Sequence, residues 1–217
     1  MKIHKYFHSC LLLKDGDTRI LFDPGGYSFL EGRAKPEDFS GIDAIVVTHS
    51  HKDHADPRVI KEIMSRNNTK IISNVGVKDM LAKDGINCEI GDENGFKIGN
   101  FFVKPVKADH EKTLRAVPEN TAYVVNDVFL HPGDSLNKNL YSLKIKALAL
   151  PVAGPWGKVT EFAEFAKNVG AETVIPIHDG VFVEEFINGQ YKMWEDHFSG
   201  SGIRFFPLRT TKEFLEI

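Results

Sequence analysis

The feature that most constrains the fold is a buried strand that runs directly into a cluster of histidines and then into a helix. Residues 44–48 are apolar and mostly β-branched, which is typical of a strand covered on both faces. Asp56 offers an N-cap and Pro57 suits the first helical position, so a helix is predicted from there to about residue 66. Between these elements stand His49, His51, Asp53 and His54. No packing role explains so dense a cluster, so a functional site is indicated at the strand end.

The rest of the chain alternates between strand and helix patterns. Further strands are predicted over residues 3–7, 9–13, 18–22, 70–73, 86–90, 95–98, 101–106, 122–125, 128–130, 145–150, 173–177 and 203–206. Further helices are predicted over residues 77–83, 159–169 and 190–198. Two blocks of mostly antiparallel strands, each followed by strand-helix units, favour an α/β fold with two sheets face to face and helices outside, a four-layer αββα sandwich. At 217 residues, we expect a single domain over 1–217.

Composition narrows the class of protein. Lys and Arg number 27 against 30 Asp and Glu, for a net charge of −3, so no basic excess marks a nucleic-acid binder. The apolar run from Cys10 to Leu13 is too short for a signal segment or a membrane span, and we expect a cytoplasmic protein without a membrane partner. Cys10 and Cys88 lack zinc-type spacing and are expected to be free thiols. Any metal is therefore expected to be bound by nitrogen and oxygen, and the oligomeric state is not indicated.

The spacing within the cluster favours two metal ions. In an extended segment, residues two apart point to the same side, so His49 and His51 can converge on one ion. Asp53 and His54 lie at the turn into the helix and point in different directions, which suits a second ion nearby. The competing interpretation is a polar loop of solvated surface histidines. The flanking strand and capped helix favour the metal site.

The motif His-x-His-x-Asp-His at residues 49–54 resembles that of the metallo-β-lactamase superfamily, whose fold is αββα. The resemblance runs from residue 20 to residue 178, and His110, Asp134 and His178 each follow a predicted strand in the order of that family. It implies that His49, His51 and His110 hold one metal, that Asp53, His54 and His178 hold a second, and that Asp134 bridges the two. Within the superfamily, the proline and glycine loop at residues 150–155 is similar to that of small lactonase-like hydrolases.

The resemblance implies a metal-dependent hydrolase with two divalent ions. Zinc is the expected metal, and manganese or iron would also be accepted. A hydroxide that bridges the ions would attack a small ester-like substrate, a lactone or a phosphodiester, with Asp134 and Asp53 as catalytic residues and Asp53 moving a proton. An iron-dependent oxygenase or redox protein is the alternative. A binding or regulatory module that keeps a metal for stability is a third.

Several residues near the motif have two interpretations each. Asp23 either orients a metal ligand or begins a turn, and His8 either faces the site and handles a proton or is a partly buried strand residue. Aromatic residues in loops either rim a substrate pocket or anchor packing: Tyr27, Phe29 and Trp156. The remaining histidines are expected at the surface: His4, His131 and His197.

Overall fold

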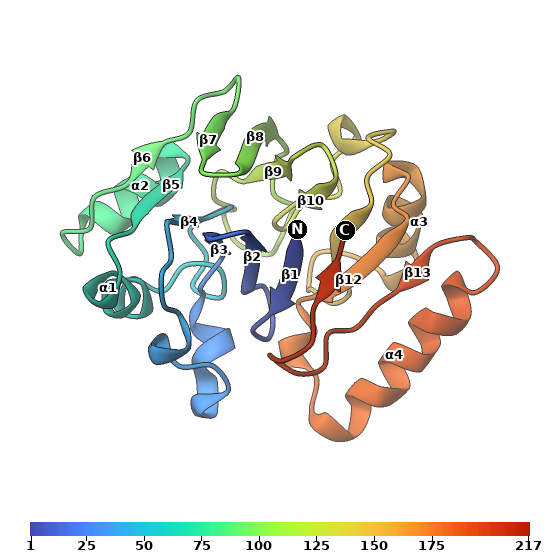
Figure 1. Ribbon diagram of the computed structural model, residues 1–217. Helices are drawn as coiled ribbons and strands as arrows, with labels where there is room; N and C mark the ends of the chain where they lie inside the picture. Colours follow the sequence, from blue (N-terminus) through green and yellow to red (C-terminus); the bar gives the residue numbers. More distant parts are fainter.

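The structure is a computed structural model that describes all residues 1–217, and it consists of two sheets packed face to face (Figure 1). The first sheet contains, from edge to edge, β14 (Leu215–Glu216), β1 (Lys2–Lys5), β2 (Leu11–Asp15), β3 (Thr18–Phe22), β4 (Ala44–Val46), β5 (Lys70–Ser73) and β6 (Glu89–Ile90). The second contains β13 (Arg204–Phe205), β12 (Thr173–Ile177), β11 (Ala147–Pro151), β10 (Phe129–His131), β9 (Thr121–Val125), β8 (Phe101–Lys107) and β7 (Phe96–Ile98).

Helices cover the outer face of each sheet, which completes four layers. Helices α1 (Pro57–Arg66) and α2 (Val75–Ala82) lie on the first sheet, and α3 (Val159–Val169) and α4 (Glu184–Phe198) lie on the second (Figure 1). Three apolar clusters follow from this layering, one between the sheets and one under each helical layer. The predicted αββα sandwich is confirmed. The physical reason is that each sheet has two apolar faces to bury and each helix has one.

The strand directions bring distant parts of the chain to one edge of the sandwich. In the first sheet β1, β2 and β3 alternate in direction, while β3, β4 and β5 run parallel. The second sheet repeats this scheme, with β8, β9 and β10 alternating and β10, β11 and β12 parallel. The carboxyl ends of β1, β3 and β4 therefore meet at one edge of their sheet, and those of β8, β10 and β12 meet at one edge of theirs. Segments that follow such strand ends are the usual place for a site in sheets of this kind.

Most predicted elements are present, with shifts at their ends. Residues 6–8, expected at the end of the first strand and in the gap after it, form a tight turn in which Phe7 and His8 have positive φ. Helix α4 begins at Glu184 rather than at residue 190, because its first turns are exposed and carry no apolar stripe that periodicity can detect. Strand β14 was not predicted. It is a short edge strand that pairs with β1 and so brings the two chain ends together. The Met1 amino group lies 2.9 Å from the Ile217 carbonyl oxygen.

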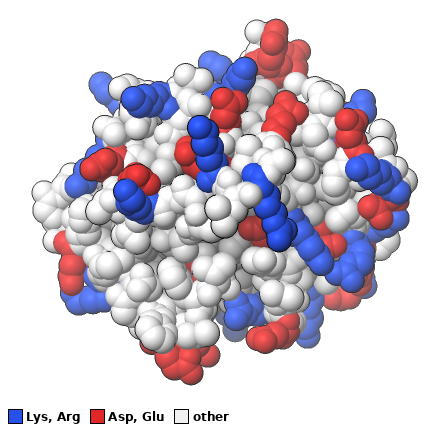
Figure 2. Space-filling model, turned by 180° about the vertical axis from the view of Figure 1, so that it is seen from behind, with Lys and Arg blue, Asp and Glu red and all other residues white.

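The surface carries charges of both signs. On the face behind the view of Figure 1, Lys and Arg side chains are interspersed with Asp and Glu (Figure 2). None of the helices has the length and apolar character that crossing a membrane requires.

Candidate metal centre

Two groups of side chains meet at the shared edge of the sheets, each able to offer one metal-binding atom per residue. The His49 group consists of His49, His51, His110 and Asp134, and the His54 group consists of His8, Asp53, His54 and His178. Within each group the ligand atoms all lie within 4.8 Å of one another. All seven residues predicted as ligands from the sequence are thus brought together, and His8 joins them.

The His-rich segment is pinned in place by the loop that follows β3. The Gly26 N–H donates to the Lys52 carbonyl oxygen at 2.7 Å. A Cβ atom at Gly25 would lie 1.9 Å from the carbonyl oxygen of Asp53, so only glycine permits this approach. The sequence Asp23-Pro24-Gly25-Gly26 therefore does more than end a strand, because it packs directly against the backbone of Asp53 and His54.

Asn120 joins two further loops, those that follow β8 and β10. The sequence did not single out this side chain. Asn120 donates from its amide to the carbonyl oxygens of Ala108 (2.8 Å) and Pro132 (3.0 Å), and its Oδ1 accepts from the Asp134 N–H (3.2 Å). Gly133 has φ +61°, and a Cβ there would lie 2.1 Å from the Asn120 Oδ1 atom. The amide thus joins the segment before His110 to the turn that carries Asp134, a role that only the folded structure reveals.

The His49 group is built from three segments. His110 Nε2 lies 3.1 Å from His51 Nδ1 and 3.4 Å from Asp134 Oδ2. His49 Nε2 lies 3.9 Å from the same carboxylate oxygen. The orientation of His110 is set by its Nδ1–H, which donates to the Glu111 carbonyl oxygen at 2.6 Å. Such a bond leaves Nε2 free to bind a metal.

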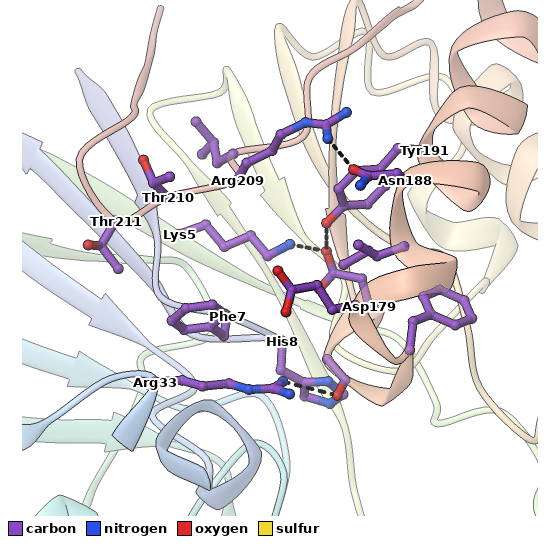
Figure 3. Close-up of a pocket in the computed structure, with 15 residues that line it drawn as sticks. Lys5, Phe7, His8, Arg33, Asp179, Asn188, Tyr191, Arg209, Thr210 and Thr211 are labelled. Atoms are coloured by element: carbon purple, nitrogen blue, oxygen red, sulfur yellow. Dashed lines mark hydrogen bonds and ion pairs between the residues drawn. The ribbon is translucent and has the colours of Figure 1, made fainter. Parts of the chain in front are cut away.

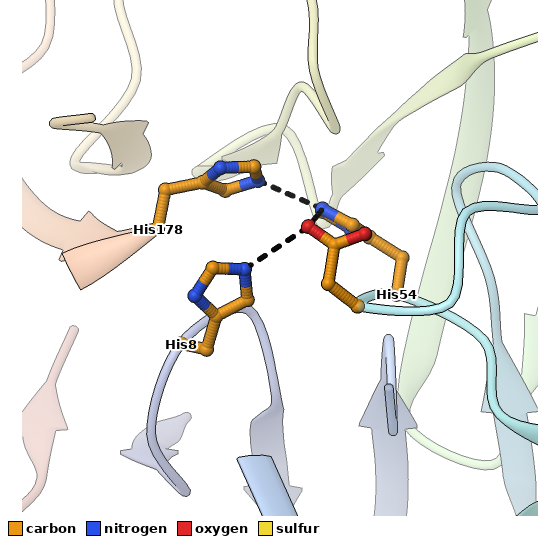
Figure 4. Close-up of side chains that lie close together, drawn as sticks. His8, His54 and His178 are labelled. Carbon is orange, nitrogen blue, oxygen red and sulfur yellow. Dashed lines mark hydrogen bonds and ion pairs between the residues drawn. The ribbon is translucent and has the colours of Figure 1, made fainter. Parts of the chain in front are cut away.

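The His54 group draws on three separate parts of the chain, and Figure 4 shows its three imidazoles. His54 Nε2 and His178 Nε2 face each other at 2.8 Å, and His8 Nε2 lies 3.2 Å from Asp53 Oδ2. His8 and His54 are fully buried, whereas the Asp53 side chain is 22% exposed. Access from solvent to this group is therefore over Asp53. The interpretation of His8 as a strand residue was wrong, because it lies in the turn after β1 with its ring in the site.

The Asp134 carboxylate lies between the two groups and presents one oxygen to each. Its Oδ1 lies 2.7 Å from His178 Nε2 and 3.1 Å from His54 Nε2. Its Oδ2 faces His110 and His49, and accepts a hydrogen bond from Trp156 Nε1 at 3.1 Å. This is the arrangement that a carboxylate shared by two ions requires.

The histidines of the cluster differ in the direction in which their pKa values are shifted. Burial lowers the pKa of His49 well below its ordinary value, and neighbouring His54 lowers it further. Burial also lowers the pKa of His8, to about 4. The neutral imidazole that results is the form that binds metal. Burial alone would lower the pKa of His54 too, but the carboxylates of Asp134 and Asp23 raise it well above its ordinary value.

The carboxylates are kept ionised by the same neighbours. Burial raises the pKa of Asp134, yet the facing imidazoles of His178, His54 and His49 lower it more, and the net result is well below the ordinary value. For Asp53, burial likewise raises the pKa, and His54 and the hydrogen bond from His8 lower it by more. Two anionic carboxylates among six imidazoles form a donor set suited to divalent cations.

The donor set fits metal ions by a further observation. His49 Nε2 and Asp134 Oδ1 are buried and have no hydrogen-bond partner, although imidazole nitrogens approach that oxygen closely. Buried polar atoms are nearly always satisfied, so one unpartnered metal-binding atom facing each group fits a donor set built to hold cations. No sulfur enters the site, since Cys10 and Cys88 are buried elsewhere.

The residues with two interpretations divide as follows. Asp23 Oδ2 lies 2.7 Å from His54 Nδ1 and also accepts from the Thr48 hydroxyl, so it orients a member of the site. The expectation of a surface position was wrong for His131, which is fully buried, 3.5 Å from Asp23 and stacked on Phe22. His4 is half-buried beside Phe214, and His197 is exposed as expected.

Of the three loop aromatic residues considered for the rim of a substrate pocket, two lie beside the site. Trp156 bonds to Asp134, and the exposed Tyr27 has its ring 5.2 Å from that of His8. Phe29 packs on Phe39 and is a packing anchor. Thr48 was not recognised as a site residue. Its hydroxyl lies 3.0 Å from His49 Nδ1, and its place directly before the motif was the available signal.

Comparison with known proteins places the chain in a family. The model of the beta-lactamase superfamily domain matches residues 2–178. The protein Rv0786c of Mycobacterium tuberculosis is 30% identical over 83% of this chain and 85% of its own. A UPF0173 metal-dependent hydrolase of Bacillus licheniformis is 32% identical over 84% of this chain and 86% of its own.

Solved structures share the fold. Igni18, a metallo hydrolase from Ignicoccus hospitalis, matches with a TM-score of 0.72 at 20% identity, over 100% of this chain and 98% of that one. CmlA, a diiron β-hydroxylase from Streptomyces venezuelae, matches with a TM-score of 0.69 at 13% identity, over 100% of this chain and 54% of that one. At these identities the likeness concerns the fold alone. The family match over most of the chain, the αββα layers and the motif at residues 49–54 together show that this chain belongs to the metallo-β-lactamase superfamily.

Proposed function

We propose that this protein, a metal-dependent hydrolase of the metallo-β-lactamase superfamily, cleaves a small ester-like substrate, a lactone or a phosphodiester, at a binuclear centre. The His49 group and the His54 group would each hold one ion, zinc in the first place, with manganese or iron also compatible with the donors. The observation that carries the proposal is the Asp134 carboxylate, which presents Oδ1 to His54 and His178 and Oδ2 to His110.

The chemistry divides between the metals and the chain. When bound, two divalent ions supply an acidified water as nucleophile and polarise the oxygen of the scissile group. Asp53 is the partly exposed carboxylate of the site, and its lowered pKa keeps it ionised. Its role in the proposal is to move a proton by way of Oδ2, where His8 Nε2 lies at 3.2 Å. Asp23 and Glu111 keep the rings of His54 and His110 in orientation through their Nδ1 atoms.

The surroundings of the centre support a small substrate. The groups are reached past Asp53 and His51, the partly exposed members of the cluster. The chain has 27 Lys and Arg against 30 Asp and Glu, so it lacks the basic excess typical of proteins that follow a nucleic-acid backbone. A compact ester with one reacting carbonyl or phosphoryl group suits such an opening.

The test is to measure metal content and reaction class on the same preparation. Elemental analysis of the purified protein is expected to give about two ions per chain. That preparation is then assayed with a lactone, a phosphodiester and a thioester, and one of the first two classes is expected to be turned over. The Asp134→Ala variant is the matched inactive control. Oxygen consumption coupled to iron, without hydrolysis of any ester, would instead identify the oxygenase alternative and refute the proposal.

A further inference from the structure

A buried ion pair joins the two sheets beside the His54 group. Lys5 is the last residue of β1 in the first sheet, and Asp179 follows β12 of the second sheet by two residues. The Lys5 Nζ atom pairs with Asp179 Oδ2, and each of the two side chains is 3% exposed. Figure 3 shows the two side chains reaching toward each other from the two sheets. The pair is therefore a polar contact between sheets whose interface is otherwise mainly apolar.

Each partner of the ion pair adjoins a turn that carries a member of the His54 group. Lys5 directly precedes the turn of residues 6–8, which contains His8, and Asp179 directly follows His178. His8 and His178 both have positive φ, 47° and 64°, a conformation that non-glycine residues keep only where their surroundings fix it. Their ring centres lie 4.6 Å apart. The ion pair thus links the two turns whose imidazoles must face the same ion.

Two further contacts fix the segment that follows His178. The Tyr191 hydroxyl of α4 donates to Asp179 Oδ2 at 2.5 Å, so the carboxylate is held by a helix as well as by the opposite sheet (Figure 3). Gly180 packs directly on His8, since a Cβ atom at Gly180 would lie 3.0 Å from both the Cβ and the Nδ1 atoms of the histidine. The segment 178–180 therefore carries one imidazole of the group and supports another.

The cost of this arrangement indicates what it supplies. Removing two charges from water can cost more than their attraction returns, so a buried ion pair is a poor source of stability. Burial lowers the pKa of Lys5, and the Asp179 carboxylate opposes that effect. A directed contact between two charged groups does, however, fix the distance between the chain segments that bear them, which apolar packing does less strictly.

We infer that Lys5, Asp179 and Tyr191 are positioning residues, which hold His8 and His178 in the orientation that the ion of the His54 group requires. None of the three is a member of either ligand group. The inference rests on the proposed binuclear centre and adds to it the contacts that keep one of its two sites in shape. The members of the His49 group follow β4, β8 and β10, so the ion there should not depend on these contacts.

The experiment measures the zinc affinity of each group separately, by chelator competition on the metal-loaded full-length chain. His51→Ala leaves the His54 group intact, and His178→Ala leaves three members of the His54 group but the whole His49 group. Into each background the triple change Lys5→Met, Asp179→Leu and Tyr191→Phe is introduced. Zinc affinity should fall by about 10–100-fold in the first background and stay unchanged in the second. The urea midpoint should change little, because apolar replacement of a buried ion pair is often neutral.

Tyr191→Phe alone is the milder variant, which keeps the ion pair and removes one hydrogen bond. It should weaken zinc binding in the His51→Ala background by about threefold. The matched control is Lys192→Gln with Asp196→Asn, which removes an exposed lysine–aspartate ion pair on the same helix and should change neither affinity.

Equal weakening of zinc binding in both backgrounds would show a general structural role and overturn the inference. Unchanged zinc affinity of the His54 group in both the triple variant and Tyr191→Phe would overturn it as well, as would the absence of zinc binding in the His51→Ala background itself. The predicted selective loss in a protein that hydrolyses no ester would instead refute the proposed function and leave the positioning role in place.

Discussion

The His49 group and the His54 group contain the same kinds of ligand but are assembled in different ways. Two imidazoles of the His49 group come from one short segment after β4, and the other two members follow β8 and β10. The His54 group takes His8 from the turn after β1 and His178 from the end of β12. Both residues have a left-handed backbone conformation, with φ 47° at His8 and φ 64° at His178. Non-glycine residues in that conformation cost free energy and persist only where packing determines them. The second group therefore depends more on tertiary structure than the first.

The supports of the two groups differ as well. His54 is braced from behind by the buried Asp23 carboxylate, whereas His49 has the neutral Thr48 hydroxyl at its Nδ1 atom. A carboxylate makes an imidazole a stronger ligand and fixes its ring more firmly than a hydroxyl does. The comparison predicts that changes in surrounding loops disturb the His54 ion first, and that only Asp134 affects both ions equally.

The largest effect is expected from Asp134→Ala, which removes the carboxylate that faces both groups. Bound metal should fall well below two ions per chain, and kcat/KM should fall by about 10³-fold or more, since metal ions contribute several kcal/mol of transition-state stabilisation. Elemental analysis and the ester assay check this. Retention of two ions and full activity would show that the two groups are not joined through this carboxylate.

Gly25→Ala should break the His54 group selectively. The added Cβ would lie 1.9 Å from the Asp53 carbonyl oxygen, so the backbone of Asp53 and His54 must move. The free energy of unfolding is expected to fall by about 2–3 kcal/mol, with loss of one ion rather than two. Urea denaturation and metal analysis measure both. Gly200→Ala is the control, because a Cβ there meets nothing within 4 Å. Equal loss of both ions would remove the distinction between the groups.

Asp23→Asn sharpens the comparison without changing side-chain size. The affinity for the ion at the His54 group should fall by about 10–100-fold, because His54 loses the carboxylate that orients it, while the ion at the His49 group is retained. Stepwise metal titration separates the two ions. The control is Asp43→Asn, an exposed carboxylate that accepts from the Arg19 N–H. If the more weakly bound ion had the same affinity in Asp23→Asn as in the unmodified protein, Asp23 would not be what holds His54 in orientation.

The smallest effect is expected from Trp156→Phe, on the side of the His49 group. This change removes the Nε1–H that donates to Asp134 Oδ2 but keeps an aromatic ring in place. Both ions should stay bound, and kcat should fall by about tenfold, the effect of one hydrogen bond to a charged group. Steady-state kinetics at known metal content decide the matter. Full activity of the variant would mean that Trp156 only packs against the site.

The sequence predicted well wherever a signal was local. Helix α1 occupies the residues expected from the N-cap Asp56, and α3 ends at Val169 as predicted, with Gly170 in the left-handed conformation. The layers followed from apolar periodicity. Predictions were poorer where burial came from distant partners, as for His131, whose place between Phe22 and Asp23 has no counterpart in its own neighbourhood along the chain.

The sequence by itself determined the strand, the motif at residues 49–54 and the order of the later ligands, because residue types and their spacing along one element are local properties. Only the tertiary structure decided that Asp134 faces both groups with different oxygens and that His8 turns into the site. These relations join segments that are remote along the chain, and they depend on parallel strands ending at a common edge and on backbone held in left-handed turns by packing.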